Sequence, residues 1–334
     1  MKIAVVILNW NGQQLLQQFL PSILQHSKIA HCAIYVADNA STDDSIAIVR
    51  KEFPSVHIVQ NTENGGYAKG YNDALKNIDA DVFTLVNSDI EVTENWLSPI
   101  VSEFKTNENT AIIQPKILSH KNKENFEYAG AGGGFIDKYG FPFCRGRIFN
   151  HLEKDSNQYN DTQQIFWASG ACLFIRSSVF KELNGFDEQF FAHQEEIDLC
   201  WRTHNLGYQI KYIGTSTVYH IGGATLKESN PHKTFLNFRN SLFVLAKNLP
   251  KKSLFPRLFI RLVFDGVAGV FFFLRLKPIH TFAIIKAHFN FYAGLRGMLR
   301  KRNTINKEDY YYTKSIVCQH FIKGVKLFNG VKKV

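Results

Sequence analysis

The stretch "FFAHQEEIDLCWR", residues 190–202, places Glu195, Glu196 and Asp198 directly after two phenylalanines. A carboxylate in such a position can act as a general base that deprotonates a hydroxyl group. The same residues also suit the first turn of a helix, because acidic side chains stabilise a helix N-terminus and Asp198 can pair with Arg202 at i,i+4. The stretch alone therefore allows both a catalytic and a purely structural interpretation.

Two further side chains are candidate ligands of a divalent cation. Asp89 closes the sequence "NSD" after one apolar run, and His220 ends another apolar run in "VYHIGG". A carboxylate oxygen and an imidazole nitrogen together can form part of a mixed metal shell. Each alone is more typical of an ordinary turn, so a metal site depends on whether the fold brings the two together.

Strands and helices alternate along the first 90 residues. Strands are expected over 2–10, 32–38, 56–61 and 81–89, with helices over 13–27, 43–53 and 67–78. This spacing indicates βαβ units and a mainly parallel sheet with both faces covered. Ligands bind such sheets at the carboxyl ends of the strands, where "NWNG", "DNAST", "NTENGG" and "NSD" fall. Asp38 and Asp89 are therefore expected at the same rim of an α/β sheet.

Residues 125–150 are rich in glycine and aromatic residues. This composition predicts turns, a hairpin or a mobile lid. The stretch "GAGGG" has no expected strand before it and no expected helix after it, so it is not interpreted as a dinucleotide-binding loop. Residues 165–186 then predict a strand, a helix and a glycine turn leading into "FFAHQEE".

The charge of the chain is unevenly distributed over its 334 residues. Residues 1–238 hold 20 Lys+Arg and 26 Asp+Glu, a net charge of −6, whereas residues 239–334 hold 19 and 3, a net charge of +16. A basic C-terminal part points to an anionic partner, such as a membrane surface, phosphate groups or nucleic acid. Nucleic acid is the least favoured of these, because the tail has no recognisable nucleic-acid-reading motif.

The segment 254–302 is apolar and aromatic but is interrupted by charged residues. Its longest uncharged run has nine residues, well below the roughly 20 that span a bilayer. Basic amphipathic helices that lie in the membrane interface fit this pattern. The alternative is an amphipathic helical subdomain packed on the rest of the protein.

Five cysteines form no CxxC pair, and three of them lie within apolar runs. Reduced, buried thiols and a cytoplasmic protein are therefore expected. The N-terminal apolar run has six residues, which is too short for a secretory signal and suits a buried strand.

Taken in order, these motifs resemble the family 2 glycosyltransferases, which are inverting enzymes of the GT-A fold, and particularly their rhamnosyltransferase-like branch. The resemblance covers about residues 1–225 through "VVILNWNG", "VADNASTDDS", "NGGYAKGYNDAL", "LVNSDIEV", "GACLFIRSSVFKELNGFDEQFFAHQEEIDLCWR" and "VYHIGG". It implies a GT-A catalytic domain over 1–225. Residues 226–334 would form a basic, aromatic helical region that associates with the membrane.

The resemblance also implies roles for individual residues. The nucleotide-sugar donor would be bound by Asn9, Asn11, Asp38, Asn64, Gly65, Gly66, Asn72, Asn87 and Ser88. Asp89 and His220 would bind Mg²⁺ or Mn²⁺. The catalytic set would be Glu196, Glu195 and Asp198, and the acceptor would meet Trp167, Gly170 and Arg239. The family has an aspartate at the position of Glu196, so whether Glu195 or Glu196 is the base stays open.

Three functions remain to be compared. The first is inverting transfer of a sugar to a lipid-linked or cell-surface glycan by an enzyme bound peripherally at the cytoplasmic face of a membrane. The resemblance favours dTDP-rhamnose as donor and leaves UDP-sugars open. The second is a metal-dependent nucleotidyltransferase, for which Glu91 would have to supply a further acid. The third is a non-catalytic module that binds nucleotide sugars or glycans.

Overall fold

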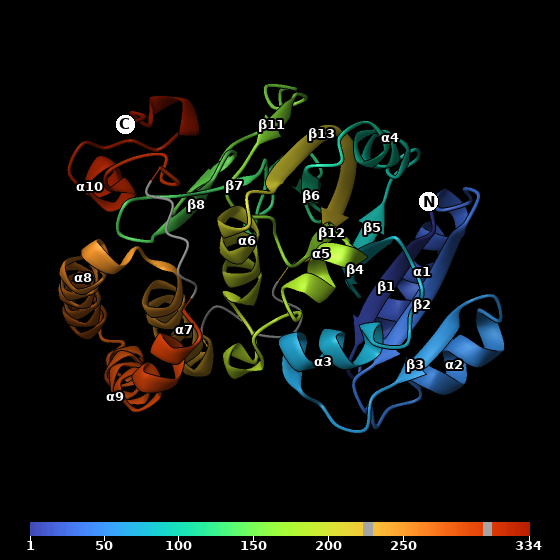
Figure 1. Cartoon of the computed structure of the whole chain (residues 1–334), viewed down its shortest axis with the longest axis horizontal. Helices are drawn as coiled ribbons and strands as arrows, with labels where there is room; N and C mark the ends of the chain where they lie inside the picture. Colours follow the sequence, from blue (N-terminus) through green and yellow to red (C-terminus); the bar gives the residue numbers. More distant parts are fainter. Residues whose placement is uncertain (223–229, 303–308) are drawn as a thin grey trace.

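A mixed, mainly parallel β-sheet forms the centre of the molecule (Figure 1). The computed structural model describes residues 1–222, 230–302 and 309–334. The strands of the central sheet are β1 (Ile3–Asn9), β2 (Cys32–Asp38), β3 (His57–Gln60), β4 (Val82–Asn87), β5 (Ile90–Val92), β6 (Thr110–Ser119), β11 (Thr162–Gln164), β12 (Cys172–Arg176) and β13 (Gln209–His220). Their order is β11-β13-β6-β12-β4-β1-β2-β3, with β5 beside β13.

Helices cover both faces of this sheet, as the sequence predicts. The helices of the first two thirds are α1 (Gln13–His26), α2 (Ser45–Glu52), α3 (Gly66–Leu75), α4 (Ser98–Thr106), α5 (Ser177–Glu182) and α6 (Glu195–Asn205). Successive side chains of a strand point to opposite faces. Val5 of β1 accordingly packs in the cluster that contains residues of α1, α2 and α4, and Val6 packs in the cluster that contains residues of α3, α5 and α6. The predicted α/β sheet with two covered faces is confirmed.

The expected strands and helices of the first 90 residues are present, with ends that differ by no more than three residues. β6 is not among the expected strands, because Pro115 interrupts its sequence and proline is disfavoured inside sheets. In the structure Pro115 lies at an irregularity of the β6–β13 pairing, between Ile213 and Thr217 of β13. The ladder is already broken there, so the missing N–H of proline is tolerated.

The glycine-rich segment forms a small antiparallel sheet beside the main one (Figure 1). Its strands are β7 (Gly134–Ile136), β8 (Pro142–Cys144), β9 (Arg147–Ile148) and β10 (His151–Leu152). Between β7 and β8, Gly140 has a φ of 79°, a conformation that glycine adopts without strain. The predicted hairpin is therefore present.

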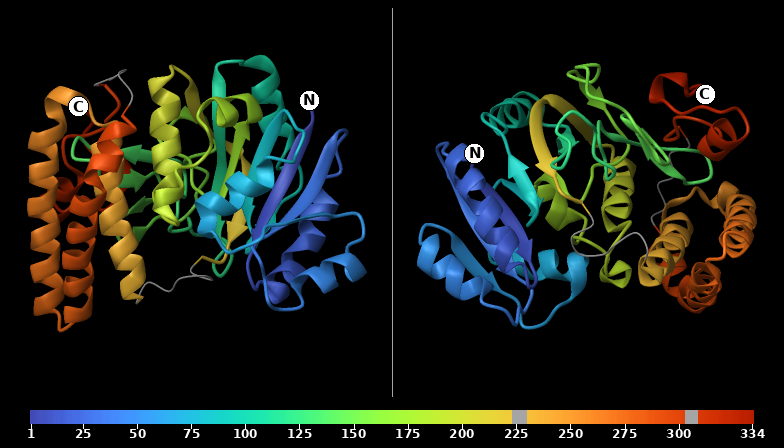
Figure 2. Two further views of the ribbon diagram at one scale, coloured as in Figure 1. Left: turned by 60° about the horizontal axis from the view of Figure 1, so that its bottom comes forward. Right: turned by 180° about the vertical axis from the view of Figure 1, so that it is seen from behind.

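Helices α7 (Pro231–Asn248), α8 (Leu254–Leu274), α9 (Pro278–Arg300) and the short α10 (Ile316–Phe321) make up most of the C-terminal part. Figure 2 shows α7, α8 and α9 side by side at the end of the molecule opposite β3. Pro231 and Pro278 occupy first turns, where a missing N–H costs no helical hydrogen bond.

The C-terminal helices share a hydrophobic cluster with the central sheet. Leu242, Leu258, Phe291 and Met298 belong to the same buried cluster as Leu85 of β4. The predicted boundary between residues 225 and 226 lies outside the described residues, and the division into two domains stays a prediction. All five cysteines are free, and Cys144, Cys172 and Cys200 are buried.

Candidate active site

Several of the expected site residues lie at one rim of the central sheet. Asn9 pairs with Asp38 at the carboxyl ends of the parallel strands β1 and β2, and Asn87 ends the neighbouring parallel strand β4. β13 runs parallel to β6, and β12 is antiparallel to both β6 and β4, so His220 ends at this rim too. Only three residues connect α6 to β13, which places the N-terminus of α6, with Glu195 and Glu196, at the same rim.

Asn9 and Asp38 form a buried polar pair at the ends of β1 and β2. The amide of Asn9 donates to Oδ1 of Asp38 at 3.0 Å, and the backbone N–H of Ser41 donates to Oδ2 at 3.0 Å. The side-chain oxygen of Asn9 is buried without a hydrogen-bond partner. Asn11 has a φ of 49° and accepts from the N–H of Thr42 at 2.7 Å. This side of the rim is thus a network that holds two loops together.

The loop Asn64–Gly66 is tied to the same rim through Asn39. The amide of Asn39 donates to Oδ1 of Asn64 at 3.2 Å and to the carbonyl of Gly66 at 2.8 Å. A Cβ on Gly66, whose φ is 72°, would lie 2.5 Å from the carbonyl oxygen of Phe191. A Cβ on Gly65 would meet the side chain of Lys69. Gly66 therefore permits a close approach to the loop before α6.

Asn72, expected to support the nucleotide loop, contacts a different segment. Its amide donates to the carbonyl of Phe186 at 2.9 Å and to Glu188 at 3.1 Å, and its oxygen accepts from the N–H of Phe186 at 2.9 Å. Asn72 thus holds the chain that leads to "FFAHQEE". The expected contact with the nucleotide stays a prediction.

Asp89 and His220 lie in contact and are both buried. Nε2 of His220 is 3.1 Å from Oδ1 of Asp89, and Nδ1 is 3.3 Å from Oε2 of Glu127. Burial lowers the pKa of His220, but the hydrogen bonds and charges of Asp89 and Glu127 outweigh it and raise the pKa to about 10. A hydroxyl neighbour, Ser88, lies close to the loop of Asn9 and Gly12.

This arrangement fits a site for a divalent cation that is completed by a substrate. Metal-binding histidines usually donate their second ring N–H to a carboxylate, and Glu127 lies in the place of that partner. Within the described ranges, no group of three or more His, Cys, Asp and Glu side chains could hold a metal ion by itself. Mg²⁺ and Mn²⁺ sites commonly use one or two protein ligands together with substrate phosphates.

Glu195, which is buried, and Glu196, which is partly exposed, form a carboxylate pair in the first turn of α6. Burial raises the pKa of Glu196 to about 7. Burial and the charge of Glu196 raise the pKa of Glu195 well above its ordinary value. The Oε2 atoms of both are buried without a hydrogen-bond partner. The raised pKa of Glu196 suits a general base, because proton transfer is most efficient when the pKa of the base lies near the working pH.

Tyr67 of α3 connects this pair to the start of β12. Its hydroxyl donates to the carbonyl of Gly170 at 2.7 Å. Burial, with smaller contributions from the charges of Tyr71, Glu195 and Glu196, raises its pKa well above the ordinary value. Gly170, an expected acceptor residue, therefore lies beside the ring of Tyr67.

Asp198, the third expected catalytic residue, is fully buried with both oxygens engaged. Oδ2 accepts from Arg202 at 2.8 Å and from Lys247 at 2.9 Å, and Oδ1 accepts from Asn248 at 2.8 Å. Burial raises the pKa of Asp198, but the charges of Arg202 and Lys247 outweigh it and lower the pKa below its usual range. These contacts suit an anchor of α6 and do not support proton transfer by Asp198.

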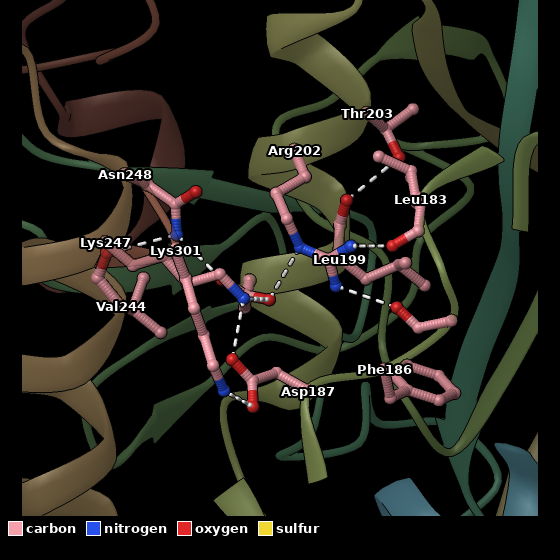
Figure 3. Close-up of polar contacts among 12 residues, drawn as sticks. Leu183, Phe186, Asp187, Leu199, Arg202, Thr203, Val244, Lys247, Asn248 and Lys301 are labelled. Atoms are coloured by element: carbon pink, nitrogen blue, oxygen red, sulfur yellow. Dashed lines mark hydrogen bonds and ion pairs between the residues drawn. The ribbon is translucent and has the colours of Figure 1, made fainter. Parts of the chain in front are cut away.

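Figure 3 shows how this anchor extends to a second carboxylate. Lys247 of α7 and Lys301, just after α9, donate to Asp187 at 2.9 Å and 2.7 Å. Arg202 also donates to the carbonyls of Leu183 and Gly185. The network therefore fastens α6 and the segment before it to the C-terminal helices.

The two remaining acceptor residues are engaged with the protein. The indole N–H of buried Trp167 donates to the carbonyl of Phe135 at 2.8 Å. The guanidinium of Arg239 donates to the carbonyls of Gln189 at 3.1 Å and Phe190 at 3.2 Å, and burial lowers its pKa. That Trp167 and Arg239 contact the acceptor stays a prediction.

Three residues of this site were not expected from the sequence: Glu127, Tyr67 and Asn240 of α7, whose amide donates to the carbonyl of His193 just before α6 at 2.7 Å. Glu127 lies in the glycine-rich segment, far from His220 in sequence, and Asn240 lies in the basic tail. Tyr67 follows the "NGG" of the nucleotide loop directly, which is the signal that could have identified it. The other two depend on long-range contacts that no local pattern reveals.

Solved structures have the same fold at low sequence identity. TarS 1–349 of S. aureus in complex with UDP-GlcNAc is 16% identical with a TM-score of 0.58, over 97% of this chain and 92% of that one. The mannosyltransferase PcManGT of Pyrobaculum calidifontis, in complex with GDP-Man and Mn²⁺, is 13% identical with a TM-score of 0.54, over 87% of each chain.

Sequence comparison agrees with this likeness. The N-acetylglucosaminyl-diphospho-decaprenol L-rhamnosyltransferase of Mycobacterium tuberculosis is 23% identical over 234 residues, which are 65% of this chain and 75% of that protein. The family model of glycosyl transferase family 2 matches residues 4–183, more than half of the chain. The α/β fold of the GT-A glycosyltransferases and the family match lead to one conclusion: this protein belongs to glycosyl transferase family 2.

Proposed function

We propose that the protein is a metal-dependent, inverting glycosyltransferase that moves a sugar from a nucleotide donor to a lipid-linked glycan. The observation that carries the proposal is the pair Glu195–Glu196, each with a buried oxygen that has no hydrogen-bond partner, at the rim that also holds Asp89 and His220. Glu196 would accept a proton there, and Asp89 and His220 would hold the cation that meets the diphosphate of the donor. Inverting transfer requires both of these functions.

In the proposed reaction Glu196 accepts the proton of an acceptor hydroxyl. The hydroxyl oxygen attacks the anomeric carbon of the donor sugar from the face opposite the nucleotide. The bond between that carbon and the diphosphate oxygen breaks, and the nucleoside diphosphate leaves with the bonding electron pair. A divalent cation bound by Asp89 and His220 would supply positive charge that stabilises this leaving group.

Asn9, Asp38 and Asn64 would bind the nucleotide, since Asn9 and Asp38 end β1 and β2 and Asn64 lies on the loop that follows β3. The identity of the donor rests on relatives. The Mycobacterium tuberculosis relative is named as an L-rhamnosyltransferase, and the TarS structure holds UDP-GlcNAc. We therefore propose dTDP-rhamnose as the first donor to test and UDP-sugars as the second.

The outer face of α8 and α9 supports a membrane-bound acceptor. It exposes Phe255 (70%), Phe259 (68%), Phe282 (67%) and Phe289 (72%), four large apolar side chains. Exposed basic residues lie at the ends of the same helices: Lys251, Lys252, Arg275, Lys277, Arg296 and Arg300. This pattern is typical of helices that insert phenylalanines between anionic lipids.

No helix within the described parts of the chain is long and apolar enough to cross a bilayer. We propose that the outer face of α8 and α9 lies in the lipid interface of the cytoplasmic membrane leaflet and brings the site to its lipid-linked acceptor. The name of the Mycobacterium tuberculosis relative includes a decaprenol-linked substrate, which agrees with an acceptor of this kind.

The alternative of a nucleotidyltransferase receives less support. Glu91, the further acid that it would need, forms ion pairs with Lys123 at 2.9 Å and His120 at 3.1 Å. The two activities also release different products. A glycosyltransferase releases a nucleoside diphosphate, and a nucleotidyltransferase releases pyrophosphate.

The test is a donor screen with the full-length protein, using dTDP-rhamnose, UDP-sugars and GDP-mannose with Mn²⁺, with Mg²⁺ and with a chelator. We expect nucleoside diphosphate release that depends on the metal and on a lipid-linked glycan, and that is about 10²–10⁴-fold slower in Glu196→Gln than in wild type. Pyrophosphate release would contradict the proposal. Metal-dependent nucleotide binding without turnover would favour the binding module.

A further inference from the structure

The loop between the 3-10 helix Glu188–Phe190 and α6 is conformationally strained. Phe191, His193 and Gln194 have φ values of 65°, 70° and 75°, in the region that favours glycine. At Phe191, whose ψ is −62°, the N–H of Ala192 donates to the carbonyl of Phe190 at 2.8 Å, which is a γ-turn of the rare hand. Such conformations persist only where surrounding contacts hold them.

The side chain of Asn240 in α7 supplies most of the contacts that hold this loop. Asn240 is completely buried, and Nδ2 of its amide lies 2.9 Å from the carbonyl oxygen of Phe190, 2.9 Å from that of Ala192 and 2.7 Å from that of His193. The two hydrogens of one amide are thus shared among three carbonyls of the strained loop. No apolar or anionic residue of similar size offers such donors.

The neighbouring carbonyls are held as well. Arg239 donates to Gln189 and Phe190, while its Nε donates to Oδ1 of Asn240 at 2.9 Å and so orients the amide. From the other side, the backbone N–H of Tyr67 donates to the carbonyl of Phe191 at 2.8 Å. Five consecutive carbonyls, from 189 to 193, therefore accept hydrogen bonds from α7 or from α3.

We propose that Asn240 is a positioning residue for glycosyl transfer, because its amide holds the strained loop and thereby fixes where Glu196 begins α6. The inference rests on the proposed function of Glu196. His193 and Gln194 directly precede the carboxylate pair, and Gln194 is the left-handed N-cap of α6. If the loop relaxes to ordinary φ values, the first turn of α6 must rotate with it.

The rest of α6 is held independently of Asn240. Asp198 remains bound to Lys247 and Asn248 of α7 and to Arg202 within α6. A change at Asn240 should therefore move the first turn while the helix and the fold persist. Displacements of about 1 Å at a reacting group can lower the rate about 10²-fold.

The experiment compares Asn240→Ala and Asn240→Asp with wild type in the full-length protein. We expect kcat to fall about 10²-fold, as for a displacement of about 1 Å at a reacting group. The dissociation constant of the nucleotide donor should stay within about threefold, because the nucleotide loops are not removed. Ser241→Ala is the matched control: Ser241 is buried beside Asn240, but its hydroxyl donates only to Asn237 within α7. It should leave both quantities unchanged.

Two further readouts separate positioning from general stability. Amide hydrogen exchange over residues 191–197 should accelerate in Asn240→Ala while exchange in the central strands does not change. Adding Gln194→Gly to Asn240→Ala should recover part of the lost kcat, because glycine adopts a φ of 75° without strain. A purely structural defect would not be rescued at this position.

The inference is overturned if the kcat values of both Asn240 variants stay within twofold of wild type, or if kcat and donor affinity fall together. If Asn240→Ala cannot be purified, Asn240→Gln, which moves the amide by one methylene, takes its place under the same criteria. If wild type itself shows no turnover with any donor, the proposed function fails. The exchange measurement then tests only whether Asn240 holds the strained loop, and unchanged exchange over residues 191–197 overturns that claim.

Discussion

The ammonium nitrogen of Lys247 in α7 lies 2.9 Å from a carboxylate oxygen of Asp198 in α6, and both side chains are buried. The C-terminal helices are therefore fastened to the helix that carries the proposed base (Figure 3). A buried charge that loses its partner is strongly destabilising, because it stays out of water without compensation.

Lys247→Met should consequently lower the free energy of unfolding by about 3 kcal/mol, the range found when one partner of a buried pair is removed. Thermal or urea unfolding measures it. Lys105→Met, at an exposed position of α4, is the control and should change stability little. An effect of Lys247→Met as small as that of the control would show that the pair does not hold α6.

The Lys247–Asp198 pair also predicts how the free energy of unfolding depends on pH. The pKa of Asp198 is lowered in the folded protein, so its carboxylate stabilises the fold above its unfolded pKa of about 4, and this contribution is lost as pH falls further. Unfolding free energies measured from pH 7 down to pH 3 should fall more steeply for wild type than for Asp198→Asn. Parallel curves would exclude Asp198 as a source of the acid sensitivity.

The carboxylate pair predicts a pH dependence of turnover. Glu196 acts as a base only when ionised, and its pKa is raised to about 7, so kcat should increase as pH rises from 6 to 8. Glu196→Gln should lower kcat by about 10²–10⁴-fold with donor binding intact. Glu195→Gln should lower kcat less than Glu196→Gln does. The reverse order of effects would assign the base to Glu195.

The contact of His220 with two carboxylates predicts a graded response to metal. Asp89→Ala should abolish turnover and the Mn²⁺-dependent part of nucleotide binding measured by calorimetry. Glu127→Ala, which removes the partner of Nδ1, should raise the Mn²⁺ concentration required by about 10–100-fold. Glu91→Ala, on the neighbouring strand β5, is the control. Normal metal dependence in Asp89→Ala would exclude this cation site.

The outer face of α8 and α9 predicts binding to anionic vesicles. Flotation of the full-length protein should show binding that weakens as salt rises, since each nearby Lys or Arg contributes about 1 kcal/mol that salt screens. Replacing Phe255, Phe259, Phe282 and Phe289 by serine should reduce the binding that persists at high salt. Equal binding to neutral and anionic vesicles, unaffected by salt, would assign the binding to apolar insertion alone. Absence of binding would contradict the membrane proposal.

The sequence by itself determined the α/β architecture and the order of the motifs. Alternating apolar runs and turn residues are local properties, so strands such as β1 and β2 and the polar loops after them follow from their own residues. Parallel pairing then places Asn9, Asp38 and Asn87 at one rim, because the carboxyl ends of such strands meet there. The candidate base residues were named from the motif that begins α6, and Asp89 and His220 were named from motifs at the ends of β4 and β13.

Tertiary structure decided what each carboxylate does. Asp198 and Glu196 are two residues apart, yet Asp198 is paired with Arg202 and Lys247, whereas Glu196 has a buried oxygen without a hydrogen-bond partner. The pairing of Asp198 with Arg202 is local to α6, but the contact with Lys247 comes from the packing of α7 against α6, which depends on neighbours distant in sequence. The same packing makes Asn240 part of the site, although nothing in its own segment of the chain indicates such a role.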